Sequence, residues 1–207
     1  MANGRFVVFE GIEGSGKSTQ AKLFYEGLLS RGEKCILTAE PTDSTIGKLI
    51  RELLRIGNKL DIRTLQLLFI ADRSEHLENF IKPKLEEGYT VITDRYAPST
   101  IVYGCSFGKK LGLKMGYLIN SHKPFLAPDL LFFIDIIPEK AFERIQARNS
   151  VKERFDELKS LKALDKNYKK LAKKYYPAVW RIIEGSGSVD SVKAGVMKSW
   201  EESKTMA

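Results

Sequence analysis

The fold is decided by the stretch Val7-Val8-Phe9-Glu10-Gly11-Ile12-Glu13-Gly14-Ser15-Gly16-Lys17-Ser18-Thr19. It fits the phosphate-binding pattern G-x-x-x-x-G-K-[ST], whose fixed positions are here Gly11, Gly16, Lys17 and Ser18. Residues 6–9 are apolar and predict a buried strand, whereas residues 18–29 have the spacing of a helix. The order of strand, glycine-rich loop and helix predicts an anion site rather than a simple turn.

The predicted chemistry of this loop is the binding of a triphosphate. Glycines let backbone N–H groups turn toward phosphate oxygens, and the following helix adds the positive end of its dipole. We expect Lys17 to reach the outer phosphates and the Ser18 hydroxyl to hold Mg²⁺. The residues predicted to bind ATP are Gly11, Ile12, Glu13, Gly14, Ser15, Gly16, Lys17, Ser18 and Thr19.

The composition is that of a soluble globular protein. The chain has 207 residues, of which 43% are hydrophobic and 29% charged, and we expect one domain over residues 1–207. No apolar run approaches the roughly 20 residues that cross a bilayer, and the N-terminus lacks a secretory-signal profile. Cys35 and Cys105 are far apart in sequence, which favours reduced thiols. We therefore expect a cytoplasmic protein with no membrane partner.

The chain is basic, with a formal net charge of +8. Such a charge suits either nucleic acid or phosphorylated small molecules. The basic residues are densest in residues 159–174, where apolar residues recur three or four positions apart. This pattern predicts an amphipathic helix with a solvated lysine face, so we expect no nucleic-acid partner. A non-catalytic protein that binds nucleotide or nucleic acid remains the alternative from another class.

Apolar runs alternate with helical patterns along the whole chain. Strands are expected over residues 5–10, 34–39, 89–93, 130–135 and 181–184. Helices are expected over residues 17–30, 45–55, 61–87, 98–121, 138–148, 155–175 and 189–203. This alternation predicts an α/β protein with a five-stranded, mainly parallel sheet flanked by helices. Ligands of such sheets bind beyond the carboxyl ends of the strands, which places the glycine loop, Glu40-Pro41 and Asp94-Arg95 at one cleft.

The third expected strand ends in a pair of opposite charges, Asp94-Arg95. A carboxylate in this position can orient a magnesium ion or its water shell. The arginine beside it offers a planar fork that suits a phosphate monoester. A surface ion pair at a strand end is the competing interpretation.

Several motifs, taken together, resemble those of the thymidylate kinase family. The match comprises Phe9-Glu10-Gly11 with its loop, Glu40-Pro41, Leu68-Phe69-Ile70-Ala71-Asp72-Arg73-Ser74-Glu75-His76, and Asp94-Arg95-Tyr96 followed by Ser99, Thr100 and Tyr103. It extends over nearly the whole chain in the right order. The resemblance implies the three-layer P-loop NTPase fold and transfer of phosphate from ATP to dTMP.

The resemblance also implies residue roles. Phe69 would stack on thymine, Arg73 would hydrogen-bond a thymine carbonyl, and Tyr103 would press against the sugar. Phe69 and Tyr103 could equally belong to the core. The residues implied to bind dTMP are Glu10, Arg51, Phe69, Arg73, Arg95, Ser99 and Tyr103. Those implied to serve catalysis are Lys17, Asp94, Arg95, Arg148 and Arg154, with Ser18 and Asp94 at the metal.

Gly104 is a departure from the family pattern, because many members carry a glutamine here that reads the pyrimidine edge. Ser99, Thr100, Ser106 or a water could replace it, or base discrimination could be looser. A kinase for another nucleoside monophosphate therefore remains the nearest alternative.

The glycine loop contains no arginine, although some family members carry one there. Family members without this loop arginine supply the catalytic positive charge from a lid segment. Residues 147–156 of this chain resemble that lid. Arg148 and Arg154 are the candidates, and Lys152 is a weaker third.

We therefore expect ATP-dependent phosphorylation of dTMP to dTDP, a step of dTTP biosynthesis, with Mg²⁺ as cofactor. The resemblance further implies a homodimer, for which the apolar-rich segment 65–81 is a candidate interface.

Overall fold

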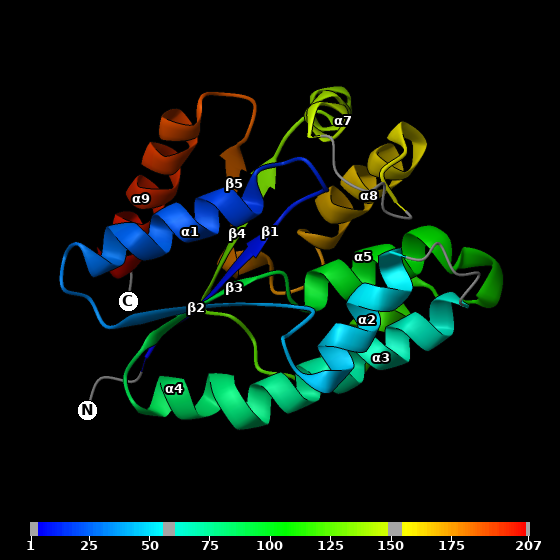
Figure 1. Cartoon of the computed structure of the whole chain (residues 1–207), viewed down its shortest axis with the longest axis horizontal. Helices are drawn as coiled ribbons and strands as arrows, with labels where there is room; N and C mark the ends of the chain where they lie inside the picture. The colour runs from blue at the N-terminus through cyan, green and yellow to red at the C-terminus, as the bar shows by residue number, and fades with distance from the viewer. Residues whose placement is uncertain (1–3, 56–60, 149–154, 206–207) are drawn as a thin grey trace.

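A five-stranded sheet forms the centre of the molecule (Figure 1). The computed structural model describes residues 4–55, 61–148 and 155–205. All strand pairs are parallel, in the order β2-β3-β1-β4-β5. The strands are β1 (Phe6–Glu10), β2 (Cys35–Ala39), β3 (Thr90–Asp94), β4 (Leu130–Asp135) and β5 (Trp180–Glu184). The predicted α/β class and strand number are confirmed.

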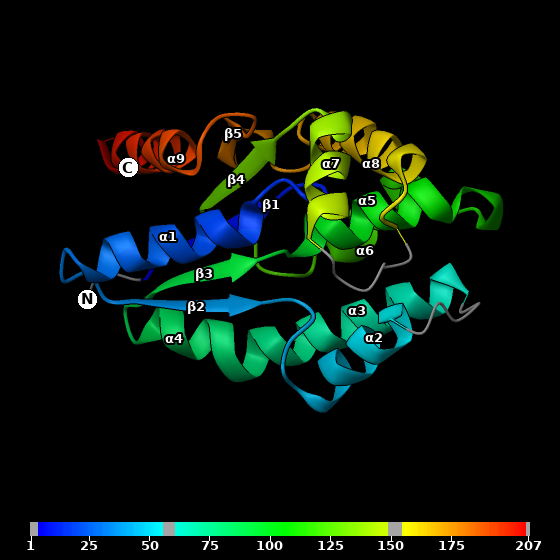
Figure 2. The same ribbon diagram turned by 45° about the horizontal axis from the view of Figure 1, so that its top comes forward.

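Helices cover both faces of this sheet (Figure 2). The described α-helices are α1 (Lys17–Leu29), α2 (Thr45–Arg55), α3 (Ile62–His76), α4 (Lys82–Glu86), α5 (Ala97–Phe107), α6 (Met115–His122), α7 (Pro138–Ala147), α8 (Leu158–Leu171) and α9 (Val189–Thr205). Among the described residues, none of the helices has the length and apolar character needed to cross a membrane.

The side chains of β1 alternate between two hydrophobic cores, as the pleat of a strand requires. Phe6 and Val8 belong to a core that includes α5 and α8, whereas Val7 and Phe9 face α1 and α9. All four side chains are buried. Burial on both faces explains why this strand reads as a continuous apolar run rather than an alternating one.

Two glycines of the loop between β1 and α1 are required by the backbone. Gly16 caps α1 at φ 90°, and Gly14 has φ 78°, so both adopt the left-handed conformation that favours glycine. A Cβ on Gly14 would also lie 2.3 Å from the carbonyl oxygen of Ala141 in α7. The loop therefore packs directly against α7.

Two helices predicted as continuous are divided in the structure. Residues 98–121 split into α5, a 3-10 turn at Lys109–Leu111 and α6, because Gly112 has φ 77° and ends the turn. Residues 61–87 form α3, a π-helical segment at Leu77–Ile81, and α4. The wider π turn immediately precedes the stretch with Pro83, a residue that has no N–H to donate to an α-helical ladder.

His122, at the end of α6, makes the stability of the fold depend on pH. It is fully buried, and its Nδ1–H donates to the carbonyl oxygen of Leu118 at 2.8 Å. Burial, together with the positive charge of Arg73, lowers the pKa of His122 from 6.5 to about 4. The unfolded chain therefore binds more protons between these values, and the free energy of unfolding falls as the pH drops through this window.

We expect the wild-type protein to lose about 2 kcal/mol of stability from this one group between pH 7 and pH 5. In the variant His122→Gln, the free energy of unfolding should fall by about 2 kcal/mol less over the same pH range, because this side chain does not titrate. Urea unfolding of both proteins at the two pH values measures the difference. Equal losses in both proteins would contradict the assignment to His122.

Candidate active site

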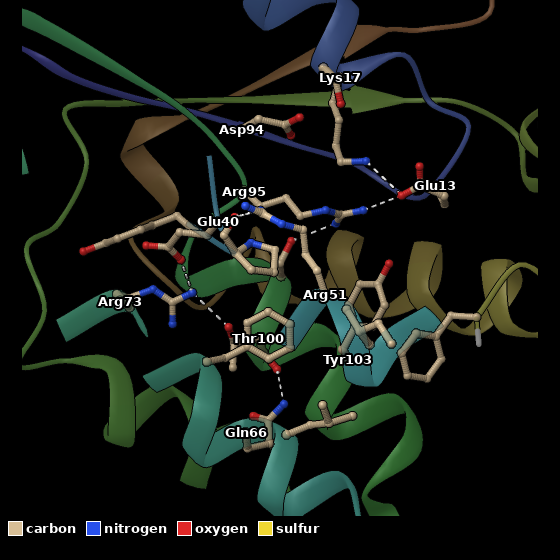
Figure 3. Close-up of a pocket in the computed structure, with 18 of the residues that line it drawn as sticks. Glu13, Lys17, Glu40, Arg51, Gln66, Arg73, Asp94, Arg95, Thr100 and Tyr103 are labelled. Carbon is tan, nitrogen blue, oxygen red and sulfur yellow. Dashed lines mark hydrogen bonds and ion pairs between the residues drawn. The ribbon is translucent and has the colours of Figure 1, made fainter. Parts of the chain in front are cut away.

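A cavity of about 400 Å³ lies at the carboxyl ends of β1 and β3, where the cleft was expected (Figure 3). Its walls come from the glycine loop, the segment after β2, and helices α2, α3 and α5. The predicted site residues that line it are Glu13, Lys17, Ser18, Arg51, Phe69, Arg73, Asp94, Arg95, Ser99 and Tyr103. Residues separated by up to about ninety positions are thus brought to one place, because the parallel strands β1 and β3 are neighbours.

One end of the cavity carries Lys17, Ser18 and Asp94. The Lys17 side chain is only 4% exposed, and its Nζ lies 3.2 Å from Oε2 of Glu13. Asp94 is the last residue of β3, and its Oδ1 is buried without a hydrogen-bond partner in the described part of the chain. This end therefore presents a fixed positive charge beside a carboxylate oxygen that still lacks a ligand.

Glu13 forms ion pairs with two of the cationic side chains of the cavity, Lys17 and Arg95. Its Oε2 accepts from Nζ of Lys17 at 3.2 Å and from Nη2 of Arg95 at 2.6 Å. The charge of Lys17, helped by that of Arg95, holds the pKa of the Glu13 carboxyl well below its usual value. Glu13 is therefore ionised at neutral pH and keeps both cations on the same side of the cavity.

Arg95 stands on a strained turn directly after β3. It has φ 72°, and its N–H donates to the carbonyl oxygen of Phe9 at 2.9 Å. A non-glycine residue in this conformation costs about 1–3 kcal/mol, which the surrounding structure must offset. The guanidinium also donates to Oγ of Ser99 at 3.0 Å and lies 5.6 Å from the ring centre of Tyr103.

Glu10 holds the turn at Arg95 in place through hydrogen bonds to the residues that follow it. Its fully buried carboxylate accepts from the N–H groups of Tyr96 and Ser99 and from the hydroxyls of Ser99 and Tyr168. Burial raises the pKa of the Glu10 carboxyl, although Arg95 and these donors oppose the shift. Glu10 is absent from the cavity wall. Its direct binding of dTMP stays a prediction, whereas its contacts hold the segment that presents Arg95.

The other end of the cavity is built around Arg73 of α3. This side chain is 1% exposed, and its Nη2 donates to Oε2 of Glu40 at 2.6 Å and to Oγ1 of Thr100 at 2.9 Å. The other oxygen of Glu40 lies 3.2 Å from Nδ1 of His76. Nε and Nη1 of Arg73 have no partner among the described residues, so the N–H of Nε and the two N–H groups of Nη1 remain for a ligand.

Phe69, Tyr103 and Arg51 complete the wall. Phe69 and Tyr103 are half-buried and line the cavity rather than lying inside the core. Arg51 reaches over from α2 and donates to the carbonyl oxygen of Pro41 and to Asp43. Their positions agree with the roles implied by the resemblance, which remain predictions.

Besides Glu10, seven described residues that were predicted for the site are absent from the cavity wall: Gly11, Ile12, Gly14, Ser15, Gly16, Thr19 and Arg148. Thr19 is exposed on the first turn of α1, and Arg148 is exposed directly after α7. Arg154 lies outside the described residues, as does Lys152. The proposed lid at residues 147–156 is therefore described only at its two ends.

The structure also identifies residues that the sequence interpretation did not select. Arg144 of α7 has Nη1 at 3.4 Å from the carbonyl oxygen of Ser15, and its Nη2 donates to that of Gly185 at 3.2 Å. The only sequence signal was its place in a cation-rich stretch. Glu40 was part of a quoted motif without an assigned role, and Gln66 carried no signal.

The family of the chain follows from its match to known proteins. A model of the family described as thymidylate kinase matches residues 9–196. The chain belongs to the thymidylate kinase family. Its activity is that of the family, the ATP-using conversion of dTMP to dTDP. The predicted family and enzyme class are confirmed.

Individual relatives match over almost their whole length. A probable thymidylate kinase of Thermococcus gammatolerans is 39% identical over 203 residues, which cover 94% of each chain. The thymidylate kinase of Brachyspira hyodysenteriae is 34% identical over 204 residues, or 98% of this chain and 96% of that one. The solved structure of the Candida albicans thymidylate kinase superposes with a TM-score of 0.83 at 28% identity, covering 99% of this chain and 94% of that one.

Proposed function

We propose that the cavity performs the reaction by holding ATP at its Lys17 end and the monophosphate of dTMP at Arg95. The observation that carries this proposal is the shared contact of Lys17 and Arg95 with one carboxylate oxygen of Glu13. Two cations that bind the same carboxylate oxygen, Lys17 buried and Arg95 half-buried, lie close enough to act on a donor and an acceptor phosphate at the point of transfer. The distance between the γ-phosphate of ATP and the phosphate of dTMP is then set by side chains whose positions are already fixed.

In this reaction an oxygen of the dTMP phosphate forms a bond to the γ-phosphorus of ATP. The bond from that phosphorus to the β,γ-bridging oxygen breaks, and ADP leaves with the electron pair. The protein adds little covalent chemistry, because such transfers depend on alignment and on neutralised phosphate charge. Lys17 neutralises charge on the donor side, and Arg95 holds the acceptor phosphate with its planar fork.

Ser18 and Asp94 would hold Mg²⁺. A hydroxyl and a carboxylate are hard oxygen ligands, and the unpartnered Oδ1 of Asp94 fits this use. Among the described residues there is no cluster of three or more His, Cys, Asp or Glu side chains suited to a metal. The ion would therefore take further ligands from phosphate and water, as Mg²⁺ commonly does, and when bound it would neutralise charge on the donor phosphates.

The base and sugar of dTMP would occupy the end with Phe69, Arg73 and Tyr103. Phe69 lines the cavity and offers a ring for stacking, and the unpartnered N–H groups on Nε and Nη1 of Arg73 suit a base carbonyl. Tyr103 lines the same cavity with its ring centre 5.6 Å from the Arg95 guanidinium carbon, so a sugar attached to the bound phosphate would lie against it. A 2′-hydroxyl would meet this ring, so deoxyribose is favoured.

Turnover of dTMP, dUMP, UMP and dGMP, measured side by side with ATP, tests the proposal. We expect dTMP to have the highest kcat/KM, dUMP to follow, and UMP and dGMP to be poor substrates. Equal turnover of all four would favour a kinase with relaxed base specificity. ADP formation with none of them, together with salt-sensitive DNA binding, would favour the non-catalytic alternative.

We further propose that a cation from the segment after α7 acts on the transferred phosphoryl group, since the glycine loop has no arginine. Arg154→Ala is expected to lower kcat about a hundredfold, the effect typical of losing one charge-stabilising donor. Its unfolding midpoint should stay unchanged. Arg148→Ala serves as the comparison, and a larger loss there would move the catalytic role to Arg148.

Assembly and location complete the proposal. Leu67 of α3 is 67% exposed, which supports the expected use of this helix in a homodimer. The single domain over residues 1–207 and the cytoplasmic location also stay predictions.

A further inference from the structure

Gln66 of α3 carries a buried hydrogen-bond acceptor that nothing in the described structure uses. The residue is 5% exposed and lines the cavity. Its Nε2 donates to the main-chain carbonyl oxygen of Thr100 at 3.1 Å (Figure 3). Its Oε1 is buried and has no partner among the described residues. An acceptor left in this state costs free energy unless a ligand or a water supplies a donor.

The orientation of this amide is determined by its neighbour. The carbonyl of Thr100 can only accept a hydrogen bond, so the amide nitrogen must face it. The two ends of the Gln66 amide therefore cannot be exchanged without breaking the bond to Thr100. The free group is an acceptor, not a donor.

Gly104 of α5 provides the space that this amide occupies. A Cβ at position 104 would lie 2.7 Å from Oε1 and 2.9 Å from Cδ of Gln66. It would also lie 2.8 Å from Cδ1 of Leu118. All three distances are shorter than carbon atoms tolerate, so any side chain at position 104 would displace Gln66. The amide of Gln66 thus replaces the side chain that position 104 lacks.

Gln66 and Arg73 both form hydrogen bonds to Thr100 of α5. Arg73 donates to the hydroxyl of Thr100, and Gln66 donates to its carbonyl oxygen. Figure 3 shows both hydrogen bonds meeting at Thr100, and Phe69 lines the same cavity. The cavity consequently has unpartnered N–H donors on Arg73 and an unpartnered acceptor on Gln66, two residues that Thr100 holds together.

We propose that Gln66 is a specificity-determining residue that recognises the 4-oxo pyrimidine ring. Thymine and uracil present an O4 acceptor next to an N3–H donor, which complements Arg73 and Gln66 in that order. Cytosine presents an amino donor and an N3 acceptor, the reverse pattern. Oε1 of Gln66 accepts from N3–H directly or through one water. This inference rests on the base position proposed above, against Phe69 and Arg73.

The test compares dTMP with N3-methyl-dTMP, which lacks the N3–H donor, in binding titrations with the wild-type protein and with Gln66→Met. Methionine has a similar length and no amide. We expect Gln66→Met to weaken dTMP binding about tenfold, as the loss of one hydrogen bond implies. The affinity for N3-methyl-dTMP should not fall, so the preference for dTMP should shrink about tenfold.

Gln20→Met is a matched control from the same fold. Gln20 is 3% exposed, its Nε2 donates to the carbonyl oxygen of Val189 at 3.0 Å, and its Oε1 also lacks a described partner. It does not line the cavity, so its replacement should leave the preference between the two ligands unchanged.

A second pair of variants tests the contact with Gly104. Gly104→Ala should weaken dTMP binding in the wild-type background more than in a Gln66→Ala background, because only the former contains the amide that the new methyl group displaces. Equal effects in both backgrounds would contradict the coupling.

The inference is overturned if Gln66→Met weakens the binding of dTMP and of N3-methyl-dTMP equally, which would indicate a purely structural role. It is also overturned if the variant weakens the binding of neither ligand. The proposed function fails separately, if the wild-type protein forms no dTDP from dTMP and ATP.

Discussion

Lys17→Met is expected to reduce kcat about a thousandfold, the upper range for one electrostatic group at a reacting centre. Lys17 begins α1, is 3% exposed, and faces the donor end of the cavity beside Asp94. Methionine keeps the length and packing of the side chain while removing its charge. Because the dTMP end is untouched, the affinity for dTMP should change little.

Steady-state formation of ADP and a separate dTMP titration measure the two effects. Lys22→Met is the matched control, since this lysine lies on the same helix with a side chain 70% exposed and forms an ion pair with Glu26. The control should keep wild-type turnover. A loss of less than tenfold for Lys17→Met would remove Lys17 from the transfer step.

The second large effect is expected at Arg95. Arg95→Met should lower kcat/KM for dTMP about a thousandfold, because the phosphate loses charge-assisted hydrogen bonds worth about 1.5–3 kcal/mol each. The KM for ATP should change only a few-fold. The strain at φ 72° is the same for both side chains, so the comparison isolates the guanidinium.

Arg95→Lys separates the charge from the planar fork. It should recover only part of the loss, since an ammonium group cannot bind a phosphate with two parallel N–H groups. Arg63→Met, at an exposed site on α3, is the control for removing a positive charge. A similar rise in KM for both substrates would contradict the assignment of Arg95 to the acceptor phosphate.

Local signals made most of the fold predictable. The strand, glycine loop and helix at the N-terminus follow from spacing and glycine content within about twenty residues, and they are confirmed in the structure. The three central strands β3, β1 and β4 were found for the same reason, because buried parallel strands are short apolar runs. The break at Gly108–Gly112 was missed because glycine inside a helical pattern has no unique meaning from sequence alone.

The candidate site was predictable to the extent that each residue belonged to a local motif. Lys17, Asp94 and Arg95 sit at strand ends or in the loop, and the parallel order of β1 and β3 brings them together. The sequence could not distinguish Glu10 from Glu13, two carboxylates three positions apart. Only packing places Glu10 beneath the turn and Glu13 within the cavity.

The amino-acid sequence by itself determined the phosphate-binding loop, the α/β class and the family. Only the tertiary structure decided what the glycine at position 104 means. In sequence it is a missing side chain, whereas in the fold its space holds the amide of Gln66, 38 positions earlier. Arg144 contacts the loop across 129 positions in the same way. Such contacts depend on how helices pack against a shared sheet, and no local pattern of residues encodes that packing.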